Sequence, residues 1–493
     1  MSDKIKRLQK RRKRVHEQNK RKKRTIEVPE DPVEFFRKIL HLEPYPYQAD
    51  FLLDPSPLKV LRWCRRAGKT TVMTGSDIHF AAVHPRSVII CTMPKFTQIK
   101  EVYFQDLDAG LHGQLERMDD EVHEALVKET LQTGIRFRNR SVIRAEVPEP
   151  FTIRGHGPSK ISIDEQNFIR KDKDLWLSAL LPMTLTKTVY INVASTPWNK
   201  DSIYHQMCFD RAFRVFSGNV WHGVEGEDLG TARYFKTWRD VLKPKGPLDP
   251  EQVEVMREQY AGDPWRWKRE MECAFVSDET AFLPSSLIIK CQNEELDLAP
   301  FEQLVEGHLY GGWDLGRERD HGVFAVINKI RDVDRLVHCK QFPLGTPYVS
   351  QMAYIKSLCD RWQHFRAIYY DRTGTKGIDE EIDRAGFPGI EGITFTRRMK
   401  HGMAVLLKDK MMTPRKSDVN LAKEDQRRTF ELPYDKDVQS ELNIVQWEQA
   451  RGSELYTFSH PEGSHDDRFW AITLAVLAAA QAPPSTIPVS RSF

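Results

Sequence analysis

The chain has 493 residues, more than one hydrophobic core usually supports, so at least two substantial domains are expected. Hydrophobic residues make up 40% and charged residues 29%, and no run of about 18 uncharged apolar residues is present to span a membrane. The seven cysteines contain no CxxC pair, which argues against a zinc site and for reduced thiols in a cytosolic compartment.

The net charge of +4 hides a strongly basic N-terminal arm. Residues 4–24 hold thirteen Lys or Arg against one Glu, so the arm carries about +12 and the remaining chain about −8. Such segments bind nucleic-acid phosphates by releasing counterions, without reading the base sequence. A disordered solubilising tail and a chance run that looks like a localisation signal are the alternatives. Residues 1–30 are therefore interpreted as a disordered basic arm that favours DNA or partner binding.

From Asp31 onward, the sequence is typical of an α/β protein. Asp31 followed by Pro32 predicts the start of a capped helix. Short runs rich in Val and Ile then alternate with helical segments, which indicates a parallel sheet. The expected strands are Val60–Cys64, Val88–Met93, Ile161–Asp164 and Val189–Ser195, and the expected helices include Thr70–Val83 and Lys95–Leu107.

The second half of the chain predicts another α/β unit. A meander of three antiparallel strands is expected first, followed by helix, strand and final helix: His308–Leu315, Gly322–Ile330, Arg335–Phe342, Pro347–Trp362, Ala367–Asp371 and Asp466–Gln481. Between the two units the pattern is less regular, with helices expected at Pro250–Tyr260 and Pro264–Met271. We thus expect domains at residues 31–198 and 301–481, a lid or connecting subdomain at 199–300, and a flexible tail at 482–493.

A phosphate-binding loop is predicted between the first strand and the first long helix. The segment Cys64–Thr71 has the sequence CRRAGKTT, whose backbone N–H groups and following helix N-terminus can cradle phosphates. Lys69 would reach the β- and γ-phosphates of ATP, and the Thr70 hydroxyl would bind Mg²⁺. Trp63 replaces the first glycine of the usual pattern, so the GKT triplet alone is weak evidence. Other residues assigned to the nucleotide are Arg65, Arg66, Gly68 and Thr71.

Two later strands end in polar residues that fit the same chemistry. Ile161–Asp164 ends in paired acids, of which Asp164 can hold Mg²⁺ and Glu165 can activate the attacking water. Acids at any exposed strand end are the alternative, but the upstream GKT favours catalysis. Ser195 and Thr196 end another strand and suit sensing of the γ-phosphate, although polar strand ends are common.

Two further residues are assigned on weaker grounds. Gln48 lies shortly before the first strand and could hydrogen-bond the edge of an adenine; an ordinary surface glutamine in a helix is the alternative. Arg154 precedes Asp164 by ten residues on a Gly-rich stretch that could present it to a neighbouring subunit. An ordinary surface arginine is the alternative there.

A second metal site is predicted from acids in the second unit. Asp314 lies in its first strand, Asp371 ends a later strand, and Asp466 and Asp467 open the final helix. Clustered carboxylates repel one another unless cations neutralise them, which favours Mg²⁺ or Mn²⁺. Two such ions, about 4 Å apart, can activate a water and stabilise the leaving oxygen of a phosphodiester. Asp320 is a candidate outer ligand.

Each of these acids also has a local structural alternative. Asp467 follows Ser464 by three residues, so the two could form a helix capping box. Asp371 precedes Thr373-Gly374 and could be a turn residue. The arrangement of all the acids on two strands and a helix favours the metal site.

With these motifs assembled, the chain resembles the large terminase subunits of tailed viruses from about Asp31 to Gln481. Residues 65–70 look like the deviant P-loop of that family, and Asp164-Glu165 like its strand-end acids. Ser195-Thr196-Pro197-Trp198 is similar to its coupling motif, and Arg154-Gly155 to its trans-acting arginine finger. Asp314, Asp371 and His465-Asp466-Asp467 resemble its nuclease acids.

The resemblance implies a P-loop ATPase domain followed by an RNase H-like nuclease domain. It further implies an ATP-driven motor that moves double-stranded viral DNA into a procapsid and cuts concatemeric DNA. The implied partners are DNA, the portal protein, a small terminase subunit and other copies of the chain in a ring of five. The implied location is the host cytoplasm, transiently at the portal and without a membrane. The basic arm is not explained by the resemblance.

Two other classes of function remain as alternatives. A helicase-like ATPase fused to a resolvase-type nuclease would act in repair or recombination, but it needs strand-separation motifs that the sequence lacks. A structural DNA-binding component with degenerate sites is the other alternative. The presence of Lys69, Glu165, Asp314 and Asp371 argues against it.

Overall fold

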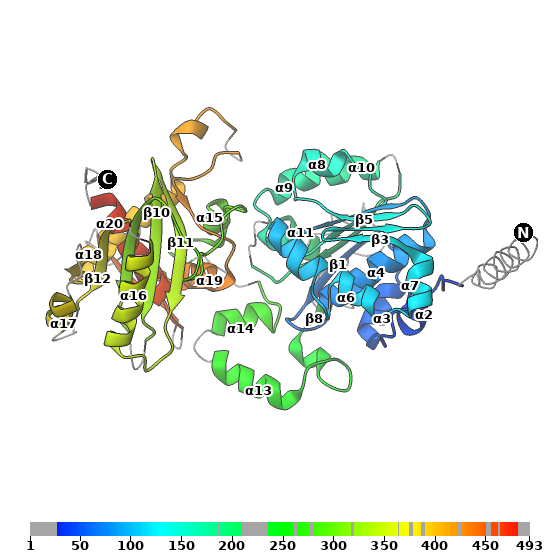
Figure 1. The fold of residues 1–493 in the computed structure, drawn as a ribbon, viewed down its shortest axis with the longest axis horizontal. Coiled ribbons are helices and arrows are strands. Elements are labelled where there is room, and N and C mark those ends of the chain that lie inside the picture. Colours follow the sequence, from blue (N-terminus) through cyan, green and yellow to red (C-terminus); the bar gives the residue numbers. More distant parts are fainter. Residues whose placement is uncertain are drawn as a thin grey trace, which may run out of the picture.

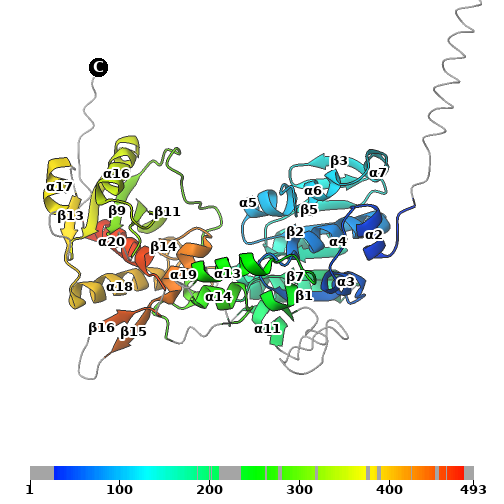
Figure 2. The same ribbon diagram turned by 90° about the horizontal axis from the view of Figure 1, so that it is seen from below.

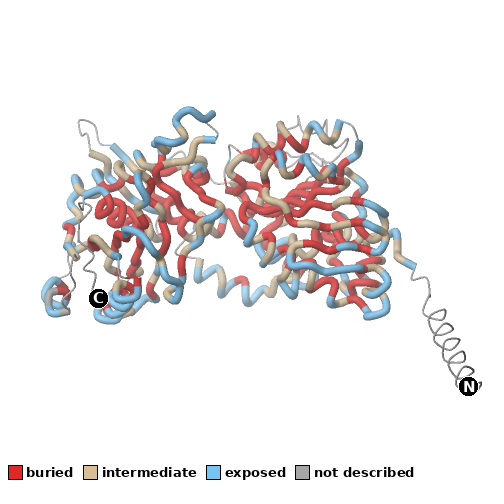
Figure 3. Tube along the Cα trace, turned by 45° about the horizontal axis from the view of Figure 1, so that its top comes forward, coloured by how far each residue is buried: buried red, intermediate tan, exposed pale blue. Residues whose placement is uncertain are grey.

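The computed structural model describes residues 27–185, 187–198, 200, 202–209, 235–260, 264–275, 280–316, 320–362, 364–373, 378–385, 390–422, 425–449, 455–461 and 464–481. The basic arm at residues 4–24 and the tail at 482–493 lie outside these ranges. Two sheet-based halves stand side by side along the long axis of the molecule, each with buried strands at its centre (Figures 1 and 3). The expected α/β class is confirmed for both halves.

The first half is built on an eight-stranded sheet in the order β3-β4-β5-β2-β6-β7-β1-β8. Strands β5, β2, β6, β7, β1 and β8 run parallel to one another, whereas β4 pairs antiparallel with both β3 and β5. The four predicted strands are present, as β1 (Leu58–Trp63), β2 (Val88–Thr92), β6 (Lys160–Ile163) and β7 (Tyr190–Ala194). The others are β3 (Val127–Leu131), β4 (Gly134–Phe137), β5 (Val142–Ala145) and β8 (Phe235–Lys236).

Strands β3 to β5 were not predicted because they lack a continuous apolar run. Four of the five residues of β3 are exposed, since this strand lies at the edge of the sheet. Its sequence, VKETL, is mainly polar, whereas the predicted central strands are buried almost throughout. The exposed edge strand β3 therefore lacks the apolar pattern by which the central strands were predicted.

Helices surround this sheet (Figure 2). The capped helix start is confirmed: the Asp31 side chain accepts hydrogen bonds from Val33 N at 2.7 Å and Glu34 N at 3.0 Å, at the start of α2. The described helices are α2 (Pro32–Lys38), α3 (Pro46–Leu53), α4 (Lys69–Val83), α5 (Phe96–Gln98), α6 (Leu111–Glu116), α7 (Asp120–Leu126), α8 (Pro150–Arg154), α9 (Asp172–Asp174), α10 (Leu181–Thr184) and α11 (Ile203–Phe209). The π-helical segments Ile99–Phe104 and Leu175–Leu180 follow α5 and α9.

The stretch expected to be a separate lid is divided between the two cores. Strand β8 pairs with β1, and Trp238 and Trp267 pack in the first core. Phe282 and Ile288 instead belong to the core of the second half. The helices of this stretch are α13 (Pro250–Gln259), α14 (Pro264–Glu270) and α15 (Ser285–Lys290). The boundaries at 199 and 300 stay predictions, but the described parts of this stretch pack largely with their neighbours.

The second half contains a six-stranded sheet in the order β13-β12-β9-β10-β11-β14. Strands β9, β10 and β11 form the predicted antiparallel meander, and β12 runs parallel to β9. This order is that of the RNase H-like fold expected from the resemblance. The strands are β9 (His308–Asp314), β10 (Val323–Ile330), β11 (Val333–Gln341), β12 (Phe365–Asp371), β13 (Ile390–Ile393) and β14 (Phe430–Glu431). A separate hairpin joins β15 (Gln446–Gln449) to β16 (Tyr456–Ser459).

The last helix lies directly on the central strand of this sheet. A Cβ atom on Gly312 of β9 would approach Ala471 O to 2.0 Å and Ala475 N to 2.4 Å, so only glycine permits this contact. Nearly every residue of α20 (Asp467–Gln481) is buried, which explains its apolar sequence. The other helices of this half are α16 (Tyr348–Trp362), α17 (Ile378–Ala385), α18 (Arg397–Met412) and α19 (Lys436–Ile444).

All seven cysteines are free thiols, five of them buried. Among the residues with described structure, no helix combines the length and apolar character needed to cross a bilayer.

Candidate ATP and nuclease sites

The phosphate-binding loop joins β1 to α4, as predicted. Gly68 has a φ of 76°, and a Cβ atom there would lie 2.5 Å from Gln48 Nε2. Arg66 also adopts a left-handed backbone, with a φ of 63°. The loop therefore turns sharply before the N-terminus of α4, the arrangement that exposes backbone N–H groups to an anion.

Two side chains at the start of α4 make contacts that bear on nucleotide binding. Lys69 Nζ donates to Trp63 O at 2.9 Å and to Cys64 O at 3.0 Å, so its ammonium lies inside the loop. Thr70 Oγ1 donates to Asp164 Oδ2 at 2.8 Å. The hydroxyl and carboxylate meet although 94 residues separate them. Both oxygens are hard ligands, and this donor set fits Mg²⁺.

The paired acids differ in their electrostatics. Burial and the neighbouring Glu165 raise the pKa of Asp164 to about 6. Burial would also raise the pKa of Glu165, but Lys436 and Lys69 outweigh it and hold that pKa below its ordinary value. Glu165 has a left-handed backbone with a φ of 54°, which turns the chain directly after β6. Such a strained conformation is more common at functional sites than elsewhere.

Ser195 and Thr196 lie beside these acids at the end of β7. Ser195 Oγ is 3.5 Å from Glu165 Oε2 and accepts a hydrogen bond from Asn167 N at 3.1 Å. Both side chains are buried. The strand end therefore connects the expected γ-phosphate sensor with the expected catalytic base.

The remaining residues assigned to the nucleotide have diverse environments. Gln48 is buried, not on the surface: its amide donates to Ala67 O at 3.3 Å and its Oε1 accepts from Tyr45 N at 3.0 Å. Arg65 pairs with Glu270 of α14 at 2.7 Å, whereas Arg66 is exposed. Thr71 contributes its backbone carbonyl to Gln114 Nε2. Adenine binding by Gln48 stays a prediction.

Arg154 lies at the end of α8, on the outer surface. Its guanidinium is 5.6 Å from the centre of the Phe151 ring, and Phe151 is 85% exposed. No described contact joins Arg154 to the phosphate-binding loop of its own chain. This placement is compatible with action on a neighbouring subunit.

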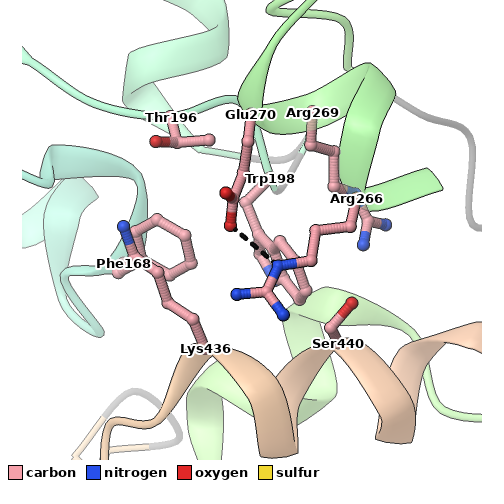
Figure 4. A pocket seen from close by; sticks show the side chains of 8 residues that line it. All are labelled: Phe168, Thr196, Trp198, Arg266, Arg269, Glu270, Lys436 and Ser440. Atoms are coloured by element: carbon pink, nitrogen blue, oxygen red, sulfur yellow. Dashed lines mark hydrogen bonds and ion pairs between the residues drawn. The ribbon is translucent and has the colours of Figure 1, made fainter. Parts of the chain in front are cut away.

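Three ion pairs around the ATP site were not predicted. Lys436, the first residue of α19, lies with its Nζ 2.6 Å from Glu165 Oε1. Arg266 of α14 pairs with Asp437 at 2.6 Å and with Glu270 at 3.0 Å. Arg266, Glu270 and Lys436 line a small pocket between the halves (Figure 4). Lys436 is 271 positions from its partner, so no local pattern could have revealed it.

The predicted nuclease acids converge at one edge of the second sheet. Asp314 ends β9, Asp371 ends the adjacent parallel strand β12, and Asp467 begins α20. Burial first, and then the charges of Asp467, Asp371 and Asp466, raise the pKa of Asp314 well above its ordinary value. Burial and the neighbouring Glu441, Asp466 and Asp320 raise the pKa of Asp467 to about 8.

Three of these acids each accept a hydrogen bond from another part of the chain. Asp371 accepts from Thr373 N at 2.8 Å, Asp466 from Trp470 Nε1 at 2.8 Å, and Asp467 from His321 N at 3.2 Å. No three His, Cys, Asp or Glu side chains in the described ranges are positioned to hold one metal ion. The chemistry of the carboxylate donor set fits Mg²⁺ or Mn²⁺.

Of the two local structural roles considered for these acids, the structure shows one and does not show the other. Asp371 does form the turn contact to Thr373. Ser464 Oγ donates to Pro461 O at 2.7 Å, and no described hydrogen bond gives the capping box with Asp467. Asp320 is exposed and influences Asp467 only through its charge. The turn role of Asp371 is therefore real, whereas the capping box is not observed.

Comparisons with known proteins find viral proteins that are similar to this chain. Residues 63–289 match the family model for the terminase large subunit, T4likevirus-type, N-terminal. The large terminase of HK97 bacteriophage is 14% identical, with a TM-score of 0.39, covering 91% of this chain and 98% of that one. The large terminase of a thermophilic bacteriophage is 12% identical, with a TM-score of 0.38, covering 88% and 98% respectively.

A third structure, the large terminase nuclease of thermophilic phage G20c, is 20% identical with a TM-score of 0.30, covering 38% of this chain and 96% of that one. No curated protein matches the chain. The family match includes the phosphate-binding loop, Asp164-Glu165 and Ser195-Thr196. Residues 63–289 accordingly resemble the N-terminal part of terminase large subunits, and this similarity supports the predicted ATPase and nuclease of viral DNA packaging.

Proposed function

We propose that this chain uses the first site to hydrolyse ATP while moving double-stranded DNA into a procapsid, and the second to cut concatemeric DNA. The observation that carries the first assignment is the 2.8 Å contact between Thr70 and Asp164, with Lys69 and Glu165 adjacent in sequence. Parallel strand ends bring these groups to one edge of a sheet, where nucleotides commonly bind. A large terminase from a thermophilic bacteriophage has been described in complex with ATPγS, in line with this assignment.

In the proposed hydrolysis, the chain's own groups bind and orient the substrate. The N–H groups of the loop hold the phosphates, and Lys69 leaves the carbonyls of Trp63 and Cys64 to bind them. Mg²⁺ bound by Thr70 and Asp164 would neutralise charge on the β- and γ-phosphates. Glu165 orients the attacking water and accepts its proton, while Ser195 positions that carboxylate.

For DNA cleavage, we propose that Asp314, Asp371, Asp466 and Asp467 hold divalent ions. The raised pKa values of Asp314 and Asp467 support this role, because crowded carboxylates favour a cation. Bound ions would activate a water and stabilise the leaving oxygen of the phosphodiester. The G20c nuclease has been described with bound magnesium and with bound cobalt.

The proposed partners are DNA, the portal, a small terminase subunit and four further copies of the chain in a ring. Assembly would take place in the host cytoplasm, at the portal of an empty capsid. The decisive test supplies purified procapsids with ATP, linear DNA and this chain. We expect DNA protected from added DNase with the wild-type chain and none with Lys69→Ala. ATP turnover without any protected DNA, in procapsids whose portal binds the chain, would contradict the packaging role.

We expect Arg154→Ala to lower ATP hydrolysis by about 10³-fold or more in assembled rings, the usual effect of losing an arginine finger. Arg154 is exposed and lies away from its own loop, so the finger would serve the next subunit. Mixing Arg154→Ala with Lys69→Ala subunits should therefore restore partial turnover at interfaces that combine one intact site with one intact finger. If no mixing ratio restores ATP turnover, Arg154 either acts on the ATP site of its own chain or has a structural role. Arg136→Ala, at another exposed arginine, is the control.

Deleting residues 1–24 should weaken non-specific DNA binding and flatten its dependence on salt. Each phosphate contact made by the arm releases counterions, so the slope of log K against log salt measures the number of contacts. Fluorescence anisotropy with a labelled duplex at several salt concentrations provides this slope. An unchanged slope would mean that the arm docks a partner or has no binding role. As a control, ATP hydrolysis without DNA should be the same with and without the arm.

A further inference from the structure

Lys436 connects the second half of the molecule to the proposed catalytic base. Its Nζ lies 2.6 Å from Glu165 Oε1, and the two residues belong to different halves, on α19 and directly after β6. Figure 4 shows the Lys436 side chain rising from α19 past Phe168 toward the first half. The side chains of Lys436 and Glu165 are 31% and 16% exposed, so solvent weakens this ion pair only in part.

The surroundings of Lys436 hold it in this position. Asp435 caps α19 by accepting from Asp437 N at 3.0 Å and Val438 N at 2.9 Å. Lys436 Nζ also lies 5.3 Å from the centre of the Phe168 ring, which in turn packs edge-on against Tyr434 at 5.4 Å. A capped helix and an aromatic contact between the halves thus fix where the ammonium points.

This contact occupies the carboxylate that hydrolysis needs. Lys436 binds Glu165 Oε1, and Ser195 Oγ lies 3.5 Å from Oε2. A general base must have a free oxygen within reach of the water that it deprotonates. While the ammonium stays in place, it engages one oxygen of Glu165, and that oxygen is not free to accept a proton from water.

We propose that Lys436 restrains Glu165 across the boundary between the two halves, keeping ATP hydrolysis low until the second half moves. This inference rests on the proposed ATPase function and deepens it by naming a residue that regulates the site. Lys436 is a positioning residue, because it acts through Glu165 rather than on ATP. The state shown here is then the restrained one.

The same helix also touches the proposed nuclease site. Glu441, on α19, accepts from Arg468 N at 2.9 Å and forms an ion pair with the Arg468 side chain. Arg468 directly follows Asp467 in α20. At its other end, α19 holds Arg266 through Asp437, and Arg266 binds Glu270, the partner of Arg65. Displacement of α19 would therefore separate Lys436 from Glu165 and would also change contacts near both proposed sites.

The test is steady-state ATP hydrolysis by the purified full-length chain, without DNA or portal, over a range of ATP concentrations. Lys436→Met keeps the length of the side chain and removes its charge. We expect kcat to rise about fivefold, which corresponds to about 1 kcal/mol, with KM for ATP nearly unchanged. Lys436→Arg keeps a cation and should hold kcat near the wild-type value.

Lys171→Ala is the matched control. Lys171 pairs with Asp425 of the second half at 2.6 Å, but away from Glu165, so its loss should leave kcat unchanged. An unchanged or lowered kcat in Lys436→Met would overturn the restraint, as would an equal rise in Lys171→Ala. Glu165→Gln is measured in parallel: if it retains wild-type turnover, the proposed ATP site fails instead, and the two failures are thereby distinguished.

Discussion

ATP hydrolysis should fall by at least about 10²-fold when Glu165 is replaced by Gln, the lower bound for losing a positioned general base. Glutamine keeps the shape of the side chain but cannot accept the proton of the attacking water. Lys69→Ala should abolish hydrolysis as well, because it removes the ammonium expected on the β- and γ-phosphates. Phosphate release from the full-length chain with Mg²⁺ and ATP measures both effects.

A loss of ATP hydrolysis in these variants tests the ATP site only if the variants are still folded. The Lys69 ammonium bonds only to the backbone carbonyls of Trp63 and Cys64 among its described contacts. Lys187→Ala is a matched control, because Lys187 Nζ likewise donates to a backbone carbonyl, that of Gly157, outside the site. We expect all three variants to melt within a few degrees of the wild type. Wild-type turnover in Lys69→Ala or Glu165→Gln would refute the assignment.

DNA cleavage should be lost in Asp314→Asn and in Asp371→Asn. A neutral amide is a poorer ligand for a hard cation and cannot balance its charge, so the proposed ions would not be held. Cleavage by the wild type should require Mg²⁺ or Mn²⁺ and stop with chelator. Plasmid nicking measures both, and ATP hydrolysis by the same variants should be intact because its residues belong to the other half.

The matched control for the nuclease acids is Asp360→Asn, at an exposed acid of α16 paired only with Lys356 among the described contacts. It should cleave DNA like the wild type. Asp371 also serves a turn through Thr373 N, a contact that an asparagine oxygen can still accept. A turn role alone therefore predicts nearly full nicking by Asp371→Asn. Full nicking by Asp314→Asn would exclude the metal site.

The crowding of these acids also predicts a dependence of stability on pH. The pKa of Asp467 is raised to about 8 in the folded chain, above its ordinary value near 4 when unfolded. The folded state then binds more protons between these values, so the metal-free chain loses stability as pH rises from about 4 to 8. Asp467→Asn should remove this loss. Its melting temperature should match the wild type near pH 4 and exceed it by several degrees near pH 8.

A local sequence pattern was sufficient to predict an element when one short segment contains all the residues that define that element. The apolar runs of β1, β2, β6 and β7 predicted a parallel sheet because buried strands must be apolar on both faces. Acids and hydroxyls directly after such strands must gather at one edge, which is why Asp164 meets Thr70 as expected. The final helix was equally clear, since α20 is buried on nearly every side.

Tertiary structure decided the features that depend on contacts between distant segments. The edge strand β3 is mainly exposed and polar, so only its pairing with β4 defines it. Strand β8 joins the first sheet from a stretch that lacks a regular pattern, because β1 offers it a free edge. Lys436 reaches Glu165 only because the two halves pack together, and a charged residue at the start of a helix carries no sign of its partner. The sequence alone thus predicts the fold class of both halves and the residue types of both proposed sites, whereas the contact between the halves depends on how the two cores pack together.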